Sequence, residues 1–479
     1  MLKKRALGVT IWSGTDLLLR QGTQFLTMMI LARLLLPADF GVIAMLSLPM
    51  GIAALLTDGG LSTVLVQRKH ITEAHKSSTF YFNITAGILA TIGIFTAAPG
   101  MSRLLNSPEL IAPMRIAAFS CLFAAFSPVH SALLTRDLQF STLAKASAFA
   151  ATGSALIAVL LAMNNMGVKT LAYYSVSMAA LTTSALWWLS PWRPRARFHW
   201  QTFRSMYGFG AYNVGTTLVD TFYNRILAPI IGRMYGTTQI GFYSQADTIR
   251  QLPSNFLSST VARAAFPLLS SMHSESPEIQ RRALQFAIRV TTLLNAPLAL
   301  GMAAASDLLV TLMLGPRWQP AAPIFTILCL ANLVQPLNAL NIQVLLAQGQ
   351  AKLVFKIEII KKFLGLTLLF TCIPFGLEVI AWGQVALAML SFPINAMYIK
   401  SSINYGVFDQ AHDALPCIAI AGATALISSQ VATKFSSSSS LIELAVTIAT
   451  MAITYLALLI LFKVTAWNEA LALLRTARS

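Results

Sequence analysis

Two polar stripes run along segments that are otherwise apolar enough to cross a membrane. In the first stripe, Asp16, Arg20 and Gln24 have the spacing that places side chains on one face of an α-helix. The second stripe begins about 200 positions further along the chain and consists of Asn213, Thr216, Asp220 and Asn224. A charged side chain at the bilayer centre costs roughly 2.5–3.5 kcal/mol, so both stripes should face hydrated space rather than lipid. The pattern predicts a transporter with a polar path between two lobes.

The composition indicates the element class that must carry these stripes. The chain has 479 residues, of which 56% are hydrophobic and 11% charged, against about 25% charged in soluble domains. Apolar runs of about 20 residues, enough to cross a hydrocarbon core, recur along the whole chain. We therefore predict an all-α polytopic membrane protein with about fourteen transmembrane helices. They are placed near residues 10–32, 40–64, 80–99, 113–134, 141–163, 168–190, 206–231, 241–268, 284–306, 321–347, 353–375, 378–399, 414–432 and 441–463.

The net charge of +17 follows the predicted topology rather than a nucleic-acid surface. Most basic residues outside the spans, such as Lys4, Arg68 and Arg193, fall on the side of the membrane that holds the N-terminus. Few, such as Arg103 and Lys434, fall on the other side. The positive-inside rule therefore predicts that both termini are cytoplasmic, with the basic loops close to lipid headgroups and no nucleic-acid partner.

Weak internal similarity divides the chain into two halves and a tail. Shifting the sequence by 200 positions aligns Arg33 with Arg233 and Gly41 with Gly241, at the first connection between helices in each half. Six predicted helices separate the copies, and an even number relates the halves by an axis along the membrane normal. We expect an N-terminal lobe at 1–200, a C-terminal lobe at 201–405 and an accessory helix pair at 406–479.

Six short segments carry a resemblance to a known family. They are LARLLLPADFGVIAM (31–45), LLTDGGLSTVLVQRK (55–69), IGRMYGTTQIGFYSQADTIRQLP (231–253), FPLLSSMH (266–273), LMLGPRWQPAAP (312–323) and LLAQGQAK (345–352). In this order they resemble the polysaccharide flippases, the Wzx-like exporters of undecaprenyl-pyrophosphate-linked repeat units, and most of all the colanic-acid and exopolysaccharide branch. The resemblance covers roughly residues 5–405. It implies the multidrug/oligosaccharidyl-lipid/polysaccharide (MOP) exporter fold, in which two six-helix lobes surround a central cavity.

The resemblance also implies a location and partners. The chain would lie in the bacterial inner membrane, bind a lipid-linked oligosaccharide among the membrane lipids, and work beside polysaccharide polymerase and assembly proteins. Moving such a headgroup through hydrocarbon would bury charge and unpaired hydrogen-bond donors. A polar cavity open sideways to lipid removes most of that barrier, so we expect alternating access with the polyprenyl tail left in the bilayer.

Four arginines are candidates for holding the pyrophosphate, because a guanidinium is always charged and its geometry matches phosphate oxygens. We rank Arg20 and Arg250 ahead of Arg225 and Arg263. The alternative is a structural ion pair, because Asp16 lies four residues before Arg20 and Asp247 three before Arg250.

Polar and acidic side chains on the same helices complete the predicted site. The candidates for sugar contacts are Asp16, Gln24, Asp58, Asn213, Asp220, Asn224, Asp247 and Gln251. For Asp58, which precedes Gly59 and Gly60, the alternative role is to cap a break in its helix. The carboxylates Asp16, Asp220 and Asp247 are also candidates for ion coupling, because burial can raise the pKa of a carboxyl group.

Other charges in the spans have simpler explanations. We expect Lys361 and Lys362 to extend toward the cytoplasmic face, with Glu358 pairing one of them, and Arg289 and Arg115 to be close enough to span ends to do the same. Cys121, Cys329, Cys372 and Cys417 fall in predicted spans and are expected to be packed thiols without disulfides.

Enzymatic signatures are not found in the sequence. The histidines show no metal-ligand spacing, and there is no P-loop or nucleotide fingerprint, so no cofactor is predicted. A drug or cation antiporter and a lipid II flippase of the same superfamily are the alternatives. A polymerase or acyltransferase would need a large extracytoplasmic loop or a catalytic histidine and carboxylate set, which the predicted topology does not offer.

Overall fold

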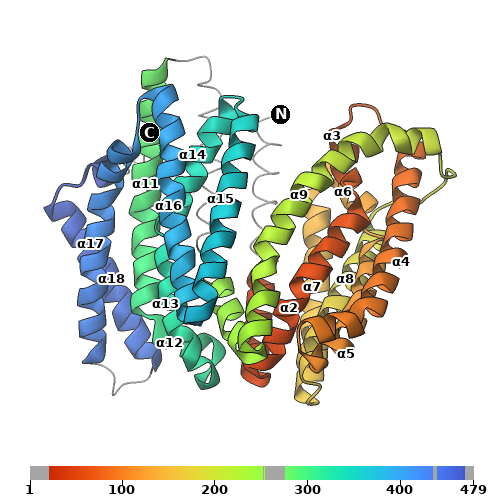
Figure 1. The fold of residues 1–479 in the computed structure, drawn as a ribbon, viewed down its shortest axis with the longest axis horizontal. Helices are drawn as coiled ribbons and strands as arrows, with labels where there is room; N and C mark the ends of the chain where they lie inside the picture. The colour runs from red at the N-terminus through yellow and green to blue at the C-terminus, as the bar shows by residue number, and fades with distance from the viewer. Residues whose placement is uncertain (1–20, 252, 254–275, 435–439, 470–479) are drawn as a thin grey trace. The chain divides into compact units, whose positions relative to one another are not determined.

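The computed structural model describes residues 21–251, 253, 276–434 and 440–469 (Figure 1). Within these residues the secondary structure is helical and contains no strand, which confirms the predicted all-α class. Residues 21–34 and 237–251 are also helical. The other main helices of the described residues are α2 (Pro37–Asp58), α3 (Leu61–Gln67), α4 (Glu73–Leu104), η1 (Pro108–Leu110), α5 (Ile111–Ala124), α6 (Pro128–Arg136), α7 (Phe140–Met163), α8 (Val168–Leu189), α9 (Trp200–Tyr235), α11 (Pro277–Ala304), α12 (Ser306–Leu314), η2 (Pro316–Ala321), α13 (Ala322–Ala331), α14 (Gln335–Ala347), α15 (Ala351–Cys372), η3 (Ile373–Phe375), α16 (Leu377–Ile403), α17 (Val407–Thr433) and α18 (Ser440–Leu461).

Many of these helices are suited to a bilayer. In the described part of the chain, eight helices are long and apolar enough to cross a membrane, or up to nine if the bent pair Pro108–Ala124 and Pro128–Arg136 forms one span. A helix falls wholly or partly on each of the predicted positions, including 21–34 on the first and 237–251 on the eighth. The chain is therefore a multi-pass membrane protein, and the count of about fourteen spans stays a prediction.

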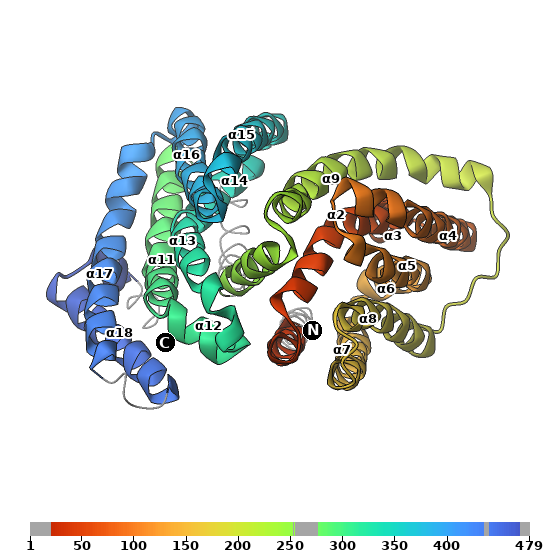
Figure 2. The same cartoon turned by 60° about the horizontal axis from the view of Figure 1, so that its bottom comes forward.

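The chain forms two compact units, Met1–Ser244 and Gln245–Ser479. In the first unit, α7 packs against α8, α8 against α5, and α5 against α4. Helix α9 runs along α2 and continues past α3 to the start of α4, as Figure 2 shows. A core cluster that includes Leu61, Leu65, Phe80, Val129 and Met206 joins α3, α4, α6 and α9. The predicted lobes at 1–200, 201–405 and 406–479 stay a prediction, since the compact units divide the chain elsewhere.

The glycines matched by the internal similarity lie at a close helix crossing in the first unit. A Cβ atom on Gly41 would lie 1.7 Å from the backbone oxygen of Thr237, and one on Gly241 would lie 2.0 Å from that of Pro37. No side chain fits such distances, so both positions require glycine. The two glycines also face each other, because the Gly241 Cβ position is 3.4 Å from the Gly41 nitrogen.

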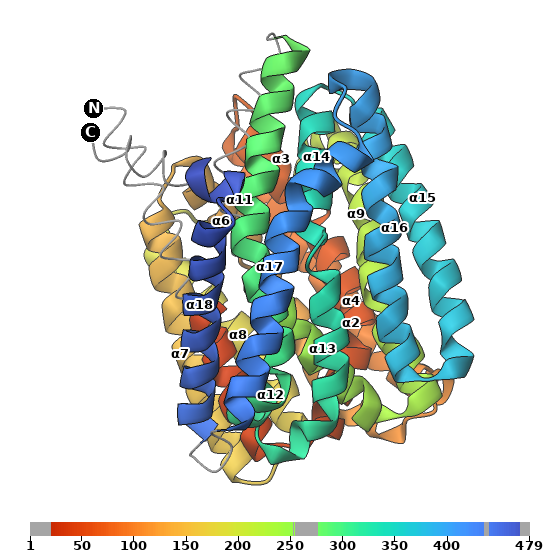
Figure 3. The ribbon, with the colours of Figure 1, turned by 90° about the vertical axis from the view of Figure 1, so that its left-hand side faces the viewer.

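In the second unit, α17 packs against α11 and against α18, and Figure 3 shows these three helices running alongside one another. Helix α16 packs on α13, α14 and α15. One core cluster, including Leu284, Leu340, Ile399 and Tyr405, joins α11, α14 and α16. Among the four cysteines, Cys121, Cys329 and Cys417 are buried and Cys372 is partly buried, and all are free thiols as predicted.

Candidate functional site

The structure describes only part of the first polar stripe. Asp16, Arg20 and Arg263 lie outside the described residues, and so does the side chain of Asn213. Gln24 is exposed on the helix at 21–34, whereas Thr27 on that helix is buried and donates to the carbonyl oxygen of Thr23 at 2.7 Å. The predicted roles of these residues stay predictions.

The second stripe lies on α9, and two of its side chains are accessible. Asp220 and Asn224 are exposed and lie one helical turn apart on the same face. Arg225 is exposed beside them. This 36-residue helix does not meet the apolarity of the eight membrane-span candidates. The exposed surface of α9 that carries these three side chains, about 140° wide, is called the α9 polar face below.

Arg225 reaches across α2 rather than pairing with an acid. Its Nη1 donates to the carbonyl oxygen of Ser47 at 3.0 Å. Its stem lies on Gly51, where a Cβ atom would meet the Arg225 Cδ at 2.7 Å and Nε at 2.8 Å, so the glycine makes room for the side chain. Among the residues that the structure describes, no carboxylate is within ion-pair distance of Arg225. Its charge is therefore not balanced by an acidic partner in this part of the chain.

Arg250 has the opposite surroundings. It is 9% exposed, and its Nε donates to Asp247 at 2.8 Å while its Nη1 donates to Asn332 Oδ1 at 2.7 Å. Asn332 in turn donates to the Arg250 carbonyl oxygen at 2.8 Å and accepts from Asn295 at its own carbonyl oxygen at 2.7 Å. Gln251 donates to the second Asp247 oxygen at 2.6 Å. This network favours the structural ion pair, the alternative to substrate contact by Arg250. Arg250 could not move toward a ligand without breaking these bonds.

Asn332 was not identified from the sequence. It lies just after α13, where an amide in an apolar run has no nearby charged residue to suggest a partner. Its two bonds to Arg250 span 82 positions of the chain. Only the fold brings these groups together.

Asp58 ends α2 and caps α3. The Ser62 hydroxyl donates to its carboxylate, and the backbone N–H groups of Gly60 and Ser62 also face it. Gly59 has φ +59° and Gly60 has φ +70°, so both occupy the left-handed region that favours glycine. The break predicted as the alternative role of Asp58 is present, and Asp58 stabilises its second helix at the N-terminus. A sugar contact by Asp58 stays a prediction.

The predicted pairing of Lys361 is confirmed, because its ammonium contacts Glu358. Arg115 lies with its guanidinium 4.9 Å from the ring centroid of Phe95. Both side chains are thus accounted for by neighbours within their own unit.

Arg289 joins a buried polar cluster rather than extending to a span end as expected. It donates to Asp413 from Nε at 3.0 Å and Nη2 at 2.8 Å, and to Glu469 from Nη1 at 2.5 Å. Gln285 at 2.9 Å and Tyr405 at 2.6 Å also donate to Asp413. Burial raises the pKa of Tyr405, and the hydrogen bond to Asp413 raises it further, so the phenol stays a donor. The cluster ties α11 to α17 and to the segment after α18.

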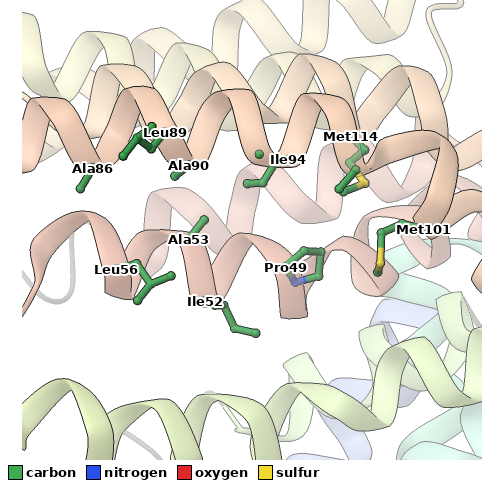
Figure 4. A pocket seen from close by; sticks show the side chains of 12 residues that line it. Pro49, Ile52, Ala53, Leu56, Ala86, Leu89, Ala90, Ile94, Met101 and Met114 are labelled. Carbon is green, nitrogen blue, oxygen red and sulfur yellow. The ribbon is translucent and has the colours of Figure 1, made fainter.

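An apolar groove of about 540 Å³ lies between α2 and α4 (Figure 4). Pro49, Ala53 and Leu56 line it from α2, and Leu89 and Ile94 from α4. The groove offers no charged group, so it suits a hydrocarbon chain and not a phosphate or a sugar. The α9 polar face, unlike this groove, carries exposed charge.

Metal chemistry finds no support in the described residues. No group of three or more histidine, cysteine, aspartate or glutamate side chains there could hold a metal ion.

The fold is that of known transporters. The lipid II flippase MurJ in an inward closed conformation superimposes with a TM-score of 0.75 at 12% identity, covering 95% of this chain and 98% of that one. An inward-facing multidrug-resistance transporter of the MATE family, in the MOP superfamily, gives a TM-score of 0.66 at 13% identity, covering 82% and 99%. The resemblance-based prediction of the MOP exporter fold is confirmed.

The sequence comparisons give the family. The teichuronic acid biosynthesis protein TuaB of Bacillus subtilis is 26% identical over 419 residues, covering 85% of each chain. The family model described as "Polysaccharide biosynthesis protein" matches residues 30–323, more than half of the chain. With its many membrane-suited helices and its exporter fold, this chain belongs to the polysaccharide biosynthesis protein family.

Proposed function

We propose that the protein moves undecaprenyl-pyrophosphate-linked oligosaccharide repeat units from the cytoplasmic to the periplasmic leaflet for exopolysaccharide or O-antigen-type polymer synthesis. Its family supports this, as does the likeness to a protein of teichuronic acid synthesis. The fold shared with a lipid II flippase supports a flipping mechanism over catalysis. The protein is a transporter of its family and not an enzyme.

One observation carries the proposal: Arg225 is exposed, with no acidic partner among the described residues, next to Asp220 and Asn224 on the α9 polar face. An unpaired guanidinium in a membrane helix is costly unless water or an anionic ligand reaches it. Phosphate oxygens would supply charge-assisted hydrogen bonds, and the carboxylate and amide would accept or donate to sugar hydroxyls. Asp16, Arg20, Gln24 and the predicted contacts other than Arg250 belong to the same proposed path, whereas Arg250 is held by Asp247 and Asn332.

The proposed topology places both termini in the cytoplasm of a bacterium and the protein in the inner membrane. The excess of lysine and arginine on the N-terminal side of the predicted spans supports it. We also propose the two lobes and accessory helix pair of the sequence division. The packing of the equivalent glycines Gly41 and Gly241 on each other supports that repeat, because equivalent positions meet where a two-fold axis passes.

A flipping assay tests the function directly. The purified full chain would be reconstituted in liposomes with a fluorescent lipid-linked oligosaccharide, prepared from the repeat unit that accumulates in a strain lacking the gene. We expect the protein to move labelled lipid from the inner to the outer leaflet of the liposomes. There a membrane-impermeant quencher or enzyme in the outer medium removes its signal. No protein-dependent movement, or no lipid-linked repeat unit in the deletion strain, would contradict the proposal.

Lipid II flipping is the second candidate, since the MurJ fold covers nearly the whole chain. Using lipid II as the probe in the same liposomes separates the two, because the proposed function predicts preference for the repeat unit. A drug or cation antiporter would instead move a cationic dye. Imposing a proton or sodium gradient in the same assay tests coupling, for which Asp220 and Asp247 are the described candidates. Polymerase and assembly proteins are proposed partners.

A further inference from the structure

A second site lies in the first unit, away from the α9 polar face and the apolar groove. Its volume is about 870 Å³, and it lies where the first turns of α4 and α9 come together. Aromatic side chains line most of it: Tyr81 and Phe82 from α4, and Phe198, Trp200, Phe203 and Tyr207 from the start of α9 and the residues before it. We call this the aromatic pocket.

Phe203 forms the centre of the aromatic pocket. Its ring centroid lies 5.1 Å from that of Phe82, 5.3 Å from that of Tyr207, and 5.6 Å from those of Phe198 and Trp200. Phe203 itself is 6% exposed, so it is the floor and the others are the walls. Such contact distances are those of aromatic pairs that stabilise one another, which fixes the rings before any ligand arrives.

The break between α2 and α3 holds the pocket from behind. At Gly59, a Cβ atom would lie 2.5 Å from Cε1 of Phe82, so the glycine gives Phe82 its position. At Gly60, a Cβ atom would lie 2.7 Å from the carbonyl oxygen of Gly210, so α9 approaches the same break closely. The two glycines therefore allow both α4 and α9, the helices that form the pocket, to pack closely against this break.

The walls of the pocket are accessible. Trp200 is 63% exposed, and Tyr81, Phe198 and Tyr207 are each at least 40% exposed. Tryptophan and tyrosine at headgroup level often only anchor a helix in the interface. An anchoring belt faces outward around the protein, whereas these rings converge on one concave site with a buried floor. Convergent aromatic walls with a few polar groups are typical of ligand sites.

A cation completes the aromatic pocket. Arg204 lines it and is exposed, and within the described part of the chain it pairs with no carboxylate. The nearest arginines before it in the sequence, Arg195 and Arg197, lie in the segment between α8 and α9. The charge therefore fits an anionic ligand, and the tyrosine hydroxyls offer donors and acceptors for a polyhydroxylated one.

We propose that the aromatic pocket binds the saccharide of the lipid-linked oligosaccharide at the predicted cytoplasmic face, before the headgroup reaches the α9 polar face. The inference rests on the proposed function and adds a second binding site to it. The weakly polarised C–H face of a sugar ring stacks on the negative face of Trp200 or Tyr207 while Arg204 contacts the phosphate. Rigid aromatic walls hold such a ligand at low cost in side-chain entropy.

Binding measurements with two probes test the proposal. The purified full chain in nanodiscs would be titrated with the lipid-linked repeat unit extracted from the deletion strain, and with undecaprenyl pyrophosphate, which carries no sugar. Removing both rings with Trp200→Ala and Tyr207→Ala should weaken binding of the glycosylated probe about 5- to 150-fold and leave the sugar-free probe unchanged. Arg204→Gln should weaken both probes.

Matched variants control for folding and for membrane anchoring. Trp188, at the end of α8, is 84% exposed and outside the pocket, so Trp188→Ala should change neither affinity. Replacing Trp200 and Tyr207 by phenylalanine keeps the rings and should keep most of the affinity for the glycosylated probe. Thermal unfolding of each variant shows whether it folds.

Two results would overturn the proposal. One is wild-type affinity of the double alanine variant for the glycosylated probe. The other is an equal loss for both probes, which assigns the rings to the lipid carrier or to anchoring. Failure of the proposed function gives a different result, namely no flipping of the glycosylated probe by wild-type protein, whatever the variants do.

Discussion

Replacing Arg225 or Arg250 by glutamine separates a ligand-binding arginine from a structural one. Arg225 is exposed, rests on Gly51 and makes one described hydrogen bond, to the carbonyl oxygen of Ser47. Arg250 is 9% exposed and bonded to Asp247 and Asn332. The same substitution therefore removes different interactions at the two positions.

The two variants should differ in magnitude and kind. Losing a hydrogen bond from Arg225 to a charged phosphate costs about 1.5–3 kcal/mol, which weakens substrate binding about 10- to 150-fold. Its exposed bond to Ser47 contributes little to folding, about 0.5 kcal/mol. Breaking the Arg250 pair leaves Asp247 and Asn332 without their donor and should lower the free energy of unfolding by about 3 kcal/mol. That is the low end for a buried pair, because the Asp247 side chain retains 30% exposure.

The assay combines liposome flipping at several substrate concentrations with thermal unfolding of the same preparations. Arg225→Gln should raise the half-saturating concentration with an unfolding temperature close to that of the wild type. Arg250→Gln should lower the unfolding temperature, and the molecules that remain folded should keep near-normal saturation. Normal saturation of Arg225→Gln together with weak saturation of a stable Arg250→Gln would refute the reasoning.

Three further substitutions have outcomes that follow from the packing. Gly51→Ala puts a Cβ 2.7 Å from the Arg225 Cδ and should reproduce part of the Arg225→Gln transport defect in the same liposomes. Normal transport by Gly51→Ala would contradict the assigned contact between Gly51 and Arg225. The Cβ of Gly41→Ala would lie 1.7 Å from the Thr237 backbone oxygen, so this variant should not accumulate as folded protein. Fluorescence-detected size exclusion measures this, and a normal monodisperse peak would contradict the close helix crossing at Gly41. Arg289→Leu strands the Asp413 carboxylate and should lower the free energy of unfolding by about 3–5 kcal/mol. Its control is Arg281→Leu, whose pair at 3.8 Å is exposed and should matter by under about 1 kcal/mol, and equal effects would refute the distinction.

Local patterns in the sequence predicted what depends on local geometry. Helix positions follow from apolar length, and the break at Gly59 follows from two adjacent glycines after Asp58. The pairs Asp247–Arg250 and Glu358–Lys361 follow from their i, i+3 spacing, which any helix brings into contact. These interactions need no knowledge of the tertiary fold.

Contacts between distant segments could not be predicted in the same way. Arg289 was expected to extend to a span end, but its partners Asp413 and Glu469 lie 124 and 180 positions away. Arg225 lies against Gly51 for the same reason, because only the packing of α9 on α2 brings them together. A single sequence does not show which helix packs against a given glycine.

Arg204, Arg225 and Arg250 differ in whether a carboxylate neutralises the guanidinium charge, rather than in which helix carries them. An arginine with a carboxylate at i−3, such as Arg250, can neutralise itself on any helix, so its presence in a span argues weakly for a ligand. Arg225 and Arg204 find no such acid among the described residues, and both lie on exposed faces of α9 about five to six turns apart. A membrane helix retains an uncompensated charge only where water or an anion reaches it, which applies to Arg225 within the predicted span at 206–231. We propose that Arg225 and Arg204 both lie along the path that an anionic headgroup would travel. The path would run from the aromatic pocket at the first turn of α9 to the α9 polar face, and loss of transport on substituting either arginine, at normal stability, is its required consequence.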